Sequence, residues 1–361
     1  MKILQVINWM DTAGAEKLLL ETIPIYNMKG VTMDLLLLNG KKSPFLEELE
    51  NQNICDIHKL SSGSLYNPIL IFKIIPFFKK YNIVHVHLFP SLYWVAFSKI
   101  IGFSKVNLIY TEHATTNKRM RNSFLRLFDK YIYNKYKKIV CISIEVEKSI
   151  KRHLNFPESK FASINNGINI SKVTNETPYL KSDLGLQIND DDILLMQVSR
   201  FQPQKDQNTL IRSLNYLPNN VHVLLVGDGI LKCESEKLSI ELGLSERVHF
   251  LGIRLDVPKL LKTADIVVLS THYEGLSLAS IEGLASGKPF VASDVPGLSE
   301  IVSGAGILFQ SQNEKALAVE IDRLIYDKDH RGRIVSQCMN RAKEYDIEIM
   351  VERHLKLYNS I

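Results

Sequence analysis

The chain has 361 residues, of which 45% are hydrophobic and 23% charged, a balance that excludes intrinsic disorder, collagen and a disulfide-based scaffold. This length exceeds the size at which a single hydrophobic core usually keeps growing, so two domains are expected. The formal net charge is only +5, so the local distribution of charge is more informative than the total.

Short apolar runs alternate with helical patterns along the whole chain, in a β-α-β rhythm. The first series of expected strands is KILQVIN, MDLLLL, IVHVHL, NLIYT and KIVCIS. The second series is ILLMQVS, VHVLLVG, RVHFLG, DIVVLS and PFVAS. Continuous apolar runs are typical of parallel strands that are buried on both faces.

This pattern predicts an α/β fold with two doubly wound, Rossmann-like domains. We expect a first domain at 1–170, a second at 171–344, and a C-terminal helix at 345–361 that packs back on the first. Ligands bind outside the carboxyl ends of the strands in such sheets, so two domains that face each other would form a cleft.

The cysteine pattern and the hydropathy of the sequence indicate the cellular compartment in which the protein is expected. The four cysteines are scattered without a CxxC pair, which favours a reducing compartment and no zinc site. The N-terminal run turns polar at Asn8, too early for a signal peptide. Lys73 and Pro76 interrupt the most apolar stretch, which is shorter than the roughly 20 residues that span a bilayer. We therefore expect a cytoplasmic protein, at most peripheral at the inner face of a membrane.

One segment, 117–138, is strongly basic and balanced only by Asp129. Its basic residues are Lys118, Arg119, Arg121, Arg126, Lys130, Lys135, Lys137 and Lys138. Four of them would form one stripe on a helix: Arg119, Arg126, Lys130 and Lys137. Such a helix is either an ordinary solvated surface or a cationic face for anionic lipid or a phosphorylated acceptor. Nucleic acid is not expected as a partner, because no recognition motif accompanies the charge.

The stretch YEGLSLASIE, 273–282, holds two carboxylates. Glu274 lies in the loop after an expected strand, and the next helix is expected from about Leu276. A helix N-terminus suits an anion, or hydroxyls next to one. Helix capping is the alternative role for Glu274. Glu282, two turns into the helix, lies among small and apolar residues where an unpaired carboxylate would be costly.

Two cations follow the first strand of the second series, in the loop RFQPQK. Arg200 and Lys205 could hold a diphosphate there, Arg200 through its planar fork and Lys205 as a point charge. Cations are also common in exposed loops, so their presence alone does not establish a site.

Taken together, these segments resemble the retaining nucleotide-sugar glycosyltransferases of family four, which have the GT-B fold. The resemblance covers nearly the whole chain, with Ala13-Gly14 where the family usually has two glycines. It is carried by EGLSLASIE with the following GLASGKPFVASDVPG, and by RFQPQK, LLVGDG, RVHFLG, INNGIN, AGAE and TEH.

The resemblance implies a role for each matching residue. Glu274 would bind hydroxyls of the donor sugar and Glu282 those of the ribose, while Arg200 and Lys205 would neutralise the leaving diphosphate. His113, at a strand end, would face the transferred sugar. The remaining donor-binding positions would be Gly14, Gly252, Gly275, Leu276, Ser277 and Leu278. The resemblance gives His85 and His87 no firm role, and we expect them to be structural.

The implied reaction moves a sugar from a nucleoside-diphosphate donor, such as a UDP-sugar, to a saccharide or lipid-linked acceptor in surface polysaccharide or glycolipid biosynthesis. Fixed cations and helix N–H groups would act where charge develops on the leaving diphosphate, so neither a metal ion nor another cofactor is expected.

Two alternatives belong to other classes. A nicotinamide-dependent dehydrogenase would use the glycines of VGDGILK, but Lys232 stands in place of the third glycine, and the first strand lacks a glycine fingerprint. A non-catalytic GT-B partner in polysaccharide assembly would not need both glutamates, Arg200 and Lys205, so their presence favours an enzyme.

Overall fold

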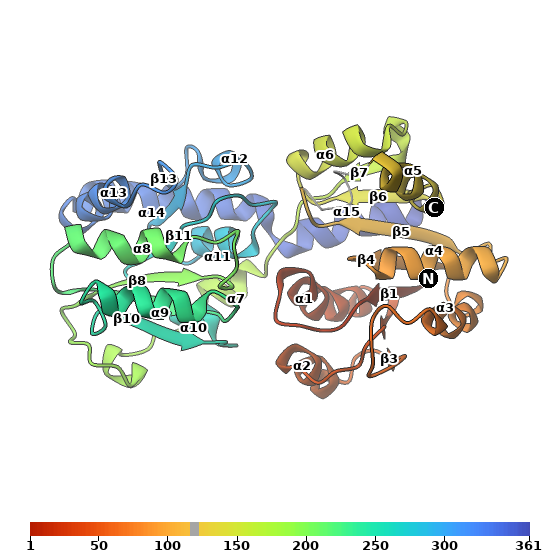
Figure 1. Ribbon diagram of the computed structural model, residues 1–361, viewed down its shortest axis with the longest axis horizontal. Coiled ribbons are helices and arrows are strands. Elements are labelled where there is room, and N and C mark those ends of the chain that lie inside the picture. Colours follow the sequence, from red (N-terminus) through yellow and green to blue (C-terminus); the bar gives the residue numbers. More distant parts are fainter. Residues whose placement is uncertain (116–122) are drawn as a thin grey trace. The chain divides into compact units, whose positions relative to one another are not determined.

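The computed structural model describes residues 1–115 and 123–361, and the chain divides into two compact units (Figure 1). Unit 1 comprises Met1–Asn166 and Ile347–Ile361, and unit 2 comprises Gly167–Asp346. The division falls at Gly167, compared with residue 171 in the sequence analysis. In the described part of the chain, no helix is both long and apolar enough to cross a bilayer.

Unit 1 is built on a parallel sheet of seven strands in the order β3-β2-β1-β4-β5-β6-β7. The order reverses between β1 and β4, so the switch point of this sheet lies at their carboxyl ends. The strands are β1 Lys2–Ile7, β2 Thr32–Leu37, β3 Ile57–Lys59, β4 Ile83–His87, β5 Asn107–Glu112, β6 Lys138–Cys141 and β7 Phe161–Ser163.

Helices cover both faces of this sheet, and the last helix of the chain is one of them. Helix α15 packs on α1, where the Nζ of Lys29 lies 2.9 Å from the Oε2 of Glu348 and the rings of Tyr26 and Tyr358 are 6.1 Å apart. The helices are α1 Gly14–Met28, α2 Pro44–Gln52, α3 Ile69–Ile74, α4 Ser91–Ile101, α5 Ser123–Tyr133, α6 Ile144–Leu154 and α15 Ile347–Asn359.

Unit 2 has a parallel sheet of six strands in the order β10-β9-β8-β11-β12-β13, with its switch point between β8 and β11. The strands are β8 Ile193–Val198, β9 Val221–Val226, β10 Val248–Gly252, β11 Ile266–Leu269, β12 Phe290–Ser293 and β13 Ile307–Phe309. The helices are α7 Ile170–Thr174, α8 Gln207–Ser213, α9 Lys232–Glu241, α10 Val257–Thr263, α11 Leu278–Ala285, α12 Ser299–Val302, α13 Glu314–Tyr326 and α14 Lys328–Ala342.

The basic segment does not form one helix through residue 138, so that prediction was wrong. Helix α5 ends at Tyr133, and Lys138 already begins β6. The chain turns between them because Tyr133 and Tyr136 are both buried, with hydroxyls that donate to Glu112 Oε2 at 2.7 Å and to the Leu92 carbonyl at 2.5 Å. Arg126 folds back onto α6, where its Nε donates to the carbonyl of His153 at 2.7 Å.

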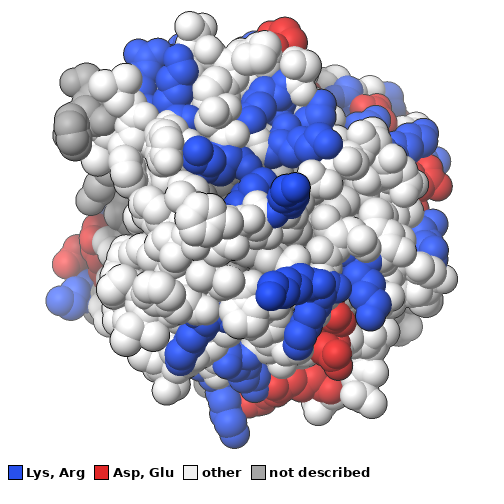
Figure 2. Space-filling view, turned by 90° about the vertical axis from the view of Figure 1, so that its right-hand side faces the viewer, with Lys and Arg blue, Asp and Glu red and all other residues white. Residues whose placement is uncertain are grey.

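Part of the predicted stripe cannot be compared, because Lys118, Arg119 and Arg121 lie outside the described residues. Basic side chains nevertheless gather on the face of unit 1 seen in Figure 2, around an uncharged area. Loops and strand starts, rather than a helical stripe, contribute the lysines of the described part of this segment that follow α5.

Candidate functional site

The switch point of unit 2 is formed by two loops that are joined by hydrogen bonds. The β8 loop, residues 199–206, follows strand β8, and the β11 loop, residues 270–277, follows strand β11. The backbone N–H of Asp206 donates to the Ser270 carbonyl at 3.1 Å. The Thr271 hydroxyl and the His272 N–H both donate to the Gln204 carbonyl, at 2.6 and 2.9 Å. The two loops therefore behave as one structural element.

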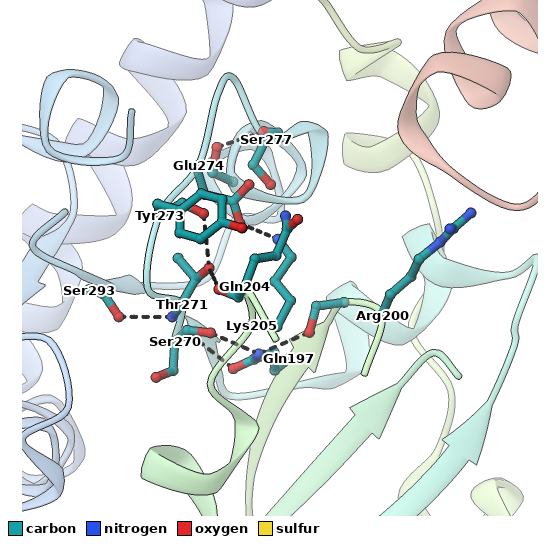
Figure 3. A network of polar contacts seen from close by, with 12 residues as sticks. Gln197, Arg200, Gln204, Lys205, Ser270, Thr271, Tyr273, Glu274, Ser277 and Ser293 are labelled. Carbon is teal, nitrogen blue, oxygen red and sulfur yellow. Dashed lines mark hydrogen bonds and ion pairs between the residues drawn. The ribbon is translucent and has the colours of Figure 1, made fainter. Parts of the chain in front are cut away.

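Gln197, near the end of β8, holds both loops through one side-chain amide (Figure 3). Its Oε1 accepts from the Ser270 N–H at 3.0 Å, and its Nε2 donates to the Ser270 carbonyl at 3.2 Å and the Ser199 hydroxyl at 2.9 Å. Gln197 is only 1% exposed, so these bonds are required to offset its desolvation. Sequence reasoning missed this residue, although a glutamine inside the apolar run ILLMQVS was the available signal.

The structure brings two of the predicted site residues into direct contact. Lys205 of the β8 loop and Glu274 of the β11 loop form an ion pair, and their side chains are 11% and 6% exposed. Figure 3 shows the two side chains pointing toward each other. Glu274 is therefore engaged with Lys205, and Ser277 is the N-cap residue of α11. Desolvated ion pairs gain little net free energy, so the pair by itself contributes little to the stability of unit 2.

Helix α11 begins at Leu278, two residues later than predicted, because Glu274 to Ser277 remain in the loop. Glu282 consequently lies in the second turn of α11, where it is 5% exposed, and not two full turns in. Gly275 and Leu276 belong to the loop, and Ser277 caps the helix without a side-chain hydrogen bond. The first N–H groups of α11 are therefore not satisfied by the side chain of the cap residue.

Glycines elsewhere in unit 2 allow close packing against both loops. A Cβ on Gly297, whose φ is +87°, would approach the Glu274 carbonyl oxygen to 2.3 Å. Cβ atoms on Gly227 and Gly229 would approach the carbonyls of Ser199 and Phe201 to 2.2 and 2.4 Å. The VGDG glycines thus accommodate the β8 loop of the protein itself, which explains them without a dinucleotide.

The other two predicted donor residues of unit 2 lie farther along the same edge. Arg200 is in the β8 loop, where its carbonyl accepts from Gln207 Nε2 at 3.0 Å, and Figure 3 shows its side chain extending away from the Lys205–Glu274 pair. Gly252 ends β10, with φ +65°, and its carbonyl accepts from the Gly227 N–H at 2.8 Å. No cluster of His, Cys, Asp and Glu suited to a metal ion occurs among the described residues.

The carboxyl edge of unit 1 carries the two remaining predictions. Gly14 opens α1 after β1, and its N-cap Ala13 makes no side-chain hydrogen bond. His113 follows β5, and its Nε2 lies 3.1 Å from Nδ1 of His87 at the end of β4. The other nitrogen of His87 lies 2.8 Å from Gln5 Oε1 on β1. His87 was expected to be structural, and the structure adds that it contacts His113 directly.

Burial keeps these histidines uncharged. It lowers the pKa of His87 well below its usual value, with further lowering by His85 and His113. Burial, followed by the nearby His354, lowers the pKa of His113 to about 4. Both imidazoles are consequently neutral near pH 7.

The hydrogen bonds around Gln5 determine which His113 nitrogen carries the proton. Gln5 Nε2 lies 3.2 Å from the Met33 sulfur, which can only accept, so the amide nitrogen faces Met33 and the amide oxygen faces His87. His87 then donates through Nε2 and accepts at Nδ1 from the Nε2–H of His113. Nδ1 of His113 is left as a hydrogen-bond acceptor.

The chain also matches known families in both units. The family described as Glycosyl transferases group 1 matches residues 182–341, and Glycosyltransferase Family 4 matches residues 12–172. The chain belongs to the group 1 glycosyltransferases. The two matches together span most of its length. The first covers the sheet of unit 2, and the second covers the sheet of unit 1 except for β1.

Named relatives of this group 1 glycosyltransferase occur in Campylobacter jejuni. One is N,N'-diacetylbacillosaminyl-diphospho-undecaprenol alpha-1,3-N-acetylgalactosaminyltransferase, 31% identical over 60% of this chain and 59% of that protein. Another is N-acetylgalactosamine-N,N'-diacetylbacillosaminyl-diphospho-undecaprenol 4-alpha-N-acetylgalactosaminyltransferase, 26% identical over 93% of each. The chain spans 55% and 59% of the length of the curated relatives that it matches at 33% and 31% identity.

A solved structure confirms the fold. HepE from Anabaena, crystallised in complex with UDP-glucose, matches with a TM-score of 0.86 over 100% of both chains at 22% identity. The two units thus have the architecture of the GT-B fold, as the sequence predicted.

Proposed function

We propose that this protein is a retaining glycosyltransferase that moves a sugar from a nucleoside-diphosphate sugar to a saccharide or lipid-linked acceptor. The observation that carries the proposal is the Lys205–Glu274 pair at the switch point of unit 2, in a chain that belongs to the group 1 glycosyltransferases. A nucleotide's phosphates bind at this point in many doubly wound sheets. HepE has been crystallised with UDP-glucose, which favours UDP as the nucleotide.

The ion pair gives the donor two groups of opposite charge. The diphosphate competes with Glu274 for the Nζ of Lys205, and Arg200 adds a second cation from the same loop. Glu274 then accepts hydrogen bonds from the donor sugar, and Glu282 from the ribose. The pair is intact in the structure, so donor binding exchanges one set of charged contacts for another and avoids leaving either group buried alone.

Transfer itself breaks the bond between the sugar C1 and a diphosphate oxygen and forms a bond between C1 and the acceptor oxygen. The acceptor proton passes to the leaving diphosphate on the same face of the sugar, which retains the anomeric configuration. Negative charge grows on the diphosphate as the bond breaks, and Arg200, Lys205 and the first N–H groups of α11 stabilise it. No step uses a metal ion.

The carboxyl edge of unit 1 supplies neutral contacts. His113 accepts a hydrogen bond from a hydroxyl of the transferred sugar through Nδ1, with Gln5 and His87 fixing its tautomer. An uncharged imidazole avoids repelling a sugar that becomes positively charged in the transition state. The N–H groups at Gly14, the first residue of α1, approach the donor phosphate.

We infer the class of acceptor from the names of the relatives. The two from Campylobacter jejuni and one from Escherichia coli are named for transfer to sugars on diphospho-undecaprenol. We therefore favour a lipid-linked acceptor in the synthesis of a surface polysaccharide or glycolipid, at the cytoplasmic face of a membrane.

The test is a screen of UDP-, GDP- and ADP-sugars for thermal stabilisation, followed by release of nucleoside diphosphate with lipid-linked acceptors. A donor at 100 times its dissociation constant should add roughly 2.7 kcal/mol to the free energy of unfolding. One donor series should stabilise the protein and release its diphosphate. If donors bind but none turns over with any acceptor, the protein is a non-catalytic GT-B partner; if none binds, the donor site is wrong.

A further inference from the structure

The amino edge of the unit 1 sheet, where its strands begin, carries a concentration of lysine. Strands β5, β6 and β7 are neighbours, so the connections that precede them lie side by side. Those connections contain a single carboxylate, Glu158. With the last turn of α4 and the first residue of β6 they provide what we call the lysine edge: Lys99, Lys105, Lys135, Lys137, Lys138 and Lys160.

These lysines are close enough to affect one another. Partial burial, and then the charges of Lys135 and Lys137, lower the pKa of Lys99. Partial burial, and then Lys99 and Lys138, lower the pKa of Lys160. Mutual repulsion of this kind is relieved when an anion binds.

Backbone oxygens, rather than acidic side chains, accept hydrogen bonds from three lysines of this edge. Lys138 Nζ donates to the Ser159 carbonyl at 2.6 Å, and Lys160 Nζ to the Asn134 carbonyl at 3.1 Å. Lys137 Nζ donates at 3.1 Å to a backbone oxygen of Ile361, the last residue of the chain, which places the lysine edge beside the C-terminus, on the side of unit 1 that Figure 2 shows. Within the described part of the chain, no ion pair to an acidic side chain involves these six lysines, whereas Lys29 and Lys59 of the same unit are paired with glutamates.

An apolar tip accompanies the charge. Phe103, between Lys99 and Lys105 in the sequence, is 93% exposed, and Ile101 is 44% exposed. Phe103 also has a φ of 45°, in the left-handed region that is unfavourable for a bulky residue. The fold gains little burial from this ring, so neither packing nor backbone preference explains a phenylalanine here.

We propose that the lysine edge docks unit 1 on an anionic lipid bilayer. The lysines contact headgroup phosphates, and Phe103 and Ile101 enter the boundary between headgroups and acyl chains. Charge complementarity alone would also suit a soluble polyanion, but an exposed ring gains free energy only from an apolar phase. The proposal is independent of the proposed function, because no step of sugar transfer uses these residues.

Co-sedimentation with vesicles tests it. The whole protein should sediment with vesicles of equal parts phosphatidylglycerol and phosphatidylcholine, and not with phosphatidylcholine alone. Neutralising two exposed lysines in the variant Lys105→Gln/Lys137→Gln should weaken partitioning roughly 30-fold. The matched control is Lys41→Gln/Lys42→Gln, an equal charge change at exposed residues of the same unit after the carboxyl end of β2. The control should change partitioning by less than about threefold, because salt screens charges beyond roughly 10 Å.

The apolar tip has its own variant. Phe103→Gly removes the ring at a position where glycine accepts positive φ without strain, so the melting temperature should hold or rise. Partitioning should fall about tenfold. Phe103→Asn, which also tolerates this φ, serves if the glycine variant folds poorly.

Four outcomes would overturn the proposal. They are equal binding to neutral vesicles, no binding to any vesicle, equal losses in the lysine-edge and control pairs, and unchanged partitioning of the Phe103 variants. The last result would assign the lysine edge to a soluble polyanion, with the ring uninvolved.

Discussion

The carboxyl edges of the two sheets carry opposite kinds of polar chemistry. In unit 2 the edge holds an ion pair, Lys205 with Glu274. In unit 1 it holds the imidazoles of His87, which is buried, and His113, which is partly buried, and their lowered pKa values keep them neutral. The same topology builds both edges at a switch point, so topology determines where ligands can bind and the side chains determine which groups are recognised. Charged groups that can exchange partners suit a diphosphate, and neutral acceptors suit hydroxyls.

The largest expected effect comes from removing a cation of unit 2. Lys205→Ala and Arg200→Ala should each lower turnover by about 10²-fold, because the charge they face is greatest in the transition state. Release of nucleoside diphosphate measures the loss. Near-normal rates in both variants would remove the diphosphate assignment.

Two controls accompany that measurement. Lys232→Ala changes a lysine of the same unit that lies 3.8 Å from Glu236 on the surface of α9, and the rate should stay within about twofold. Lys205→Ala combined with Glu274→Gln avoids leaving a buried carboxylate unpaired, so it separates a loss of stability from a loss of rate.

The two glutamates of the site should differ in kind as well as in size. In the proposed mechanism, Glu274 contacts the sugar that becomes positively charged. Glu274→Gln should therefore mainly lower the maximal rate. In the proposed mechanism, Glu282 contacts the ribose equally in the ground state and the transition state. Glu282→Gln should therefore mainly weaken donor binding. Calorimetry with the bare nucleoside diphosphate is the control: only Glu282→Gln should impair it. Equal effects of both variants on this ligand would contradict the assignment.

The neutral edge of unit 1 predicts a loss of stability in acid. The histidines His85, His87, His113 and His354 all have pKa values below the ordinary 6.5, mainly through burial. The unfolded chain therefore binds more protons below pH 6.5, and stability falls from about that pH toward pH 4, by at most about 1.4 kcal/mol per pH unit for each histidine.

Tryptophan fluorescence can follow this loss in unit 1 alone. The chain has two tryptophans, Trp9 and Trp94, and both belong to unit 1. The melting temperature reported by them should fall between pH 6.5 and pH 4, and less steeply in His354→Gln. If the melting temperature of His354→Gln falls as steeply with pH as that of the wild type, His354 does not titrate as described.

The smallest expected effect is that of chelation. If Arg200, Lys205 and the start of α11 neutralise the diphosphate, then EDTA should leave initial rates of sugar transfer nearly unchanged. A loss of rate that Mg²⁺ or Mn²⁺ restores would mean that the charged edge of unit 2 needs a metal partner.

Sequence patterns predicted the central strands of both sheets, because continuous apolar runs are a strong signal for strands buried on both faces. They missed β3, β7 and β13, each three residues long and at a sheet edge, where burial on both faces is not required. Motif reasoning identified Lys205 and Glu274 but not their contact, since 69 residues separate them in the chain. The position of His87 at the end of IVHVHL indicated that it lies near His113, because β4 pairs with β5 and His113 follows β5.

Calorimetric titration with UDP tests the contrast between the two edges most directly, with the wild type, Lys205→Met and His113→Gln compared under one condition. The charged edge should bind the diphosphate, so Lys205→Met should weaken affinity by at least about tenfold, the effect of losing one hydrogen-bonded charge. The neutral edge should contact the transferred sugar, which UDP lacks, so His113→Gln should leave the affinity for UDP unchanged. If His113→Gln weakens UDP binding as much as Lys205→Met, or if Lys205→Met has no effect, the division between a charged diphosphate edge and a neutral sugar edge is wrong.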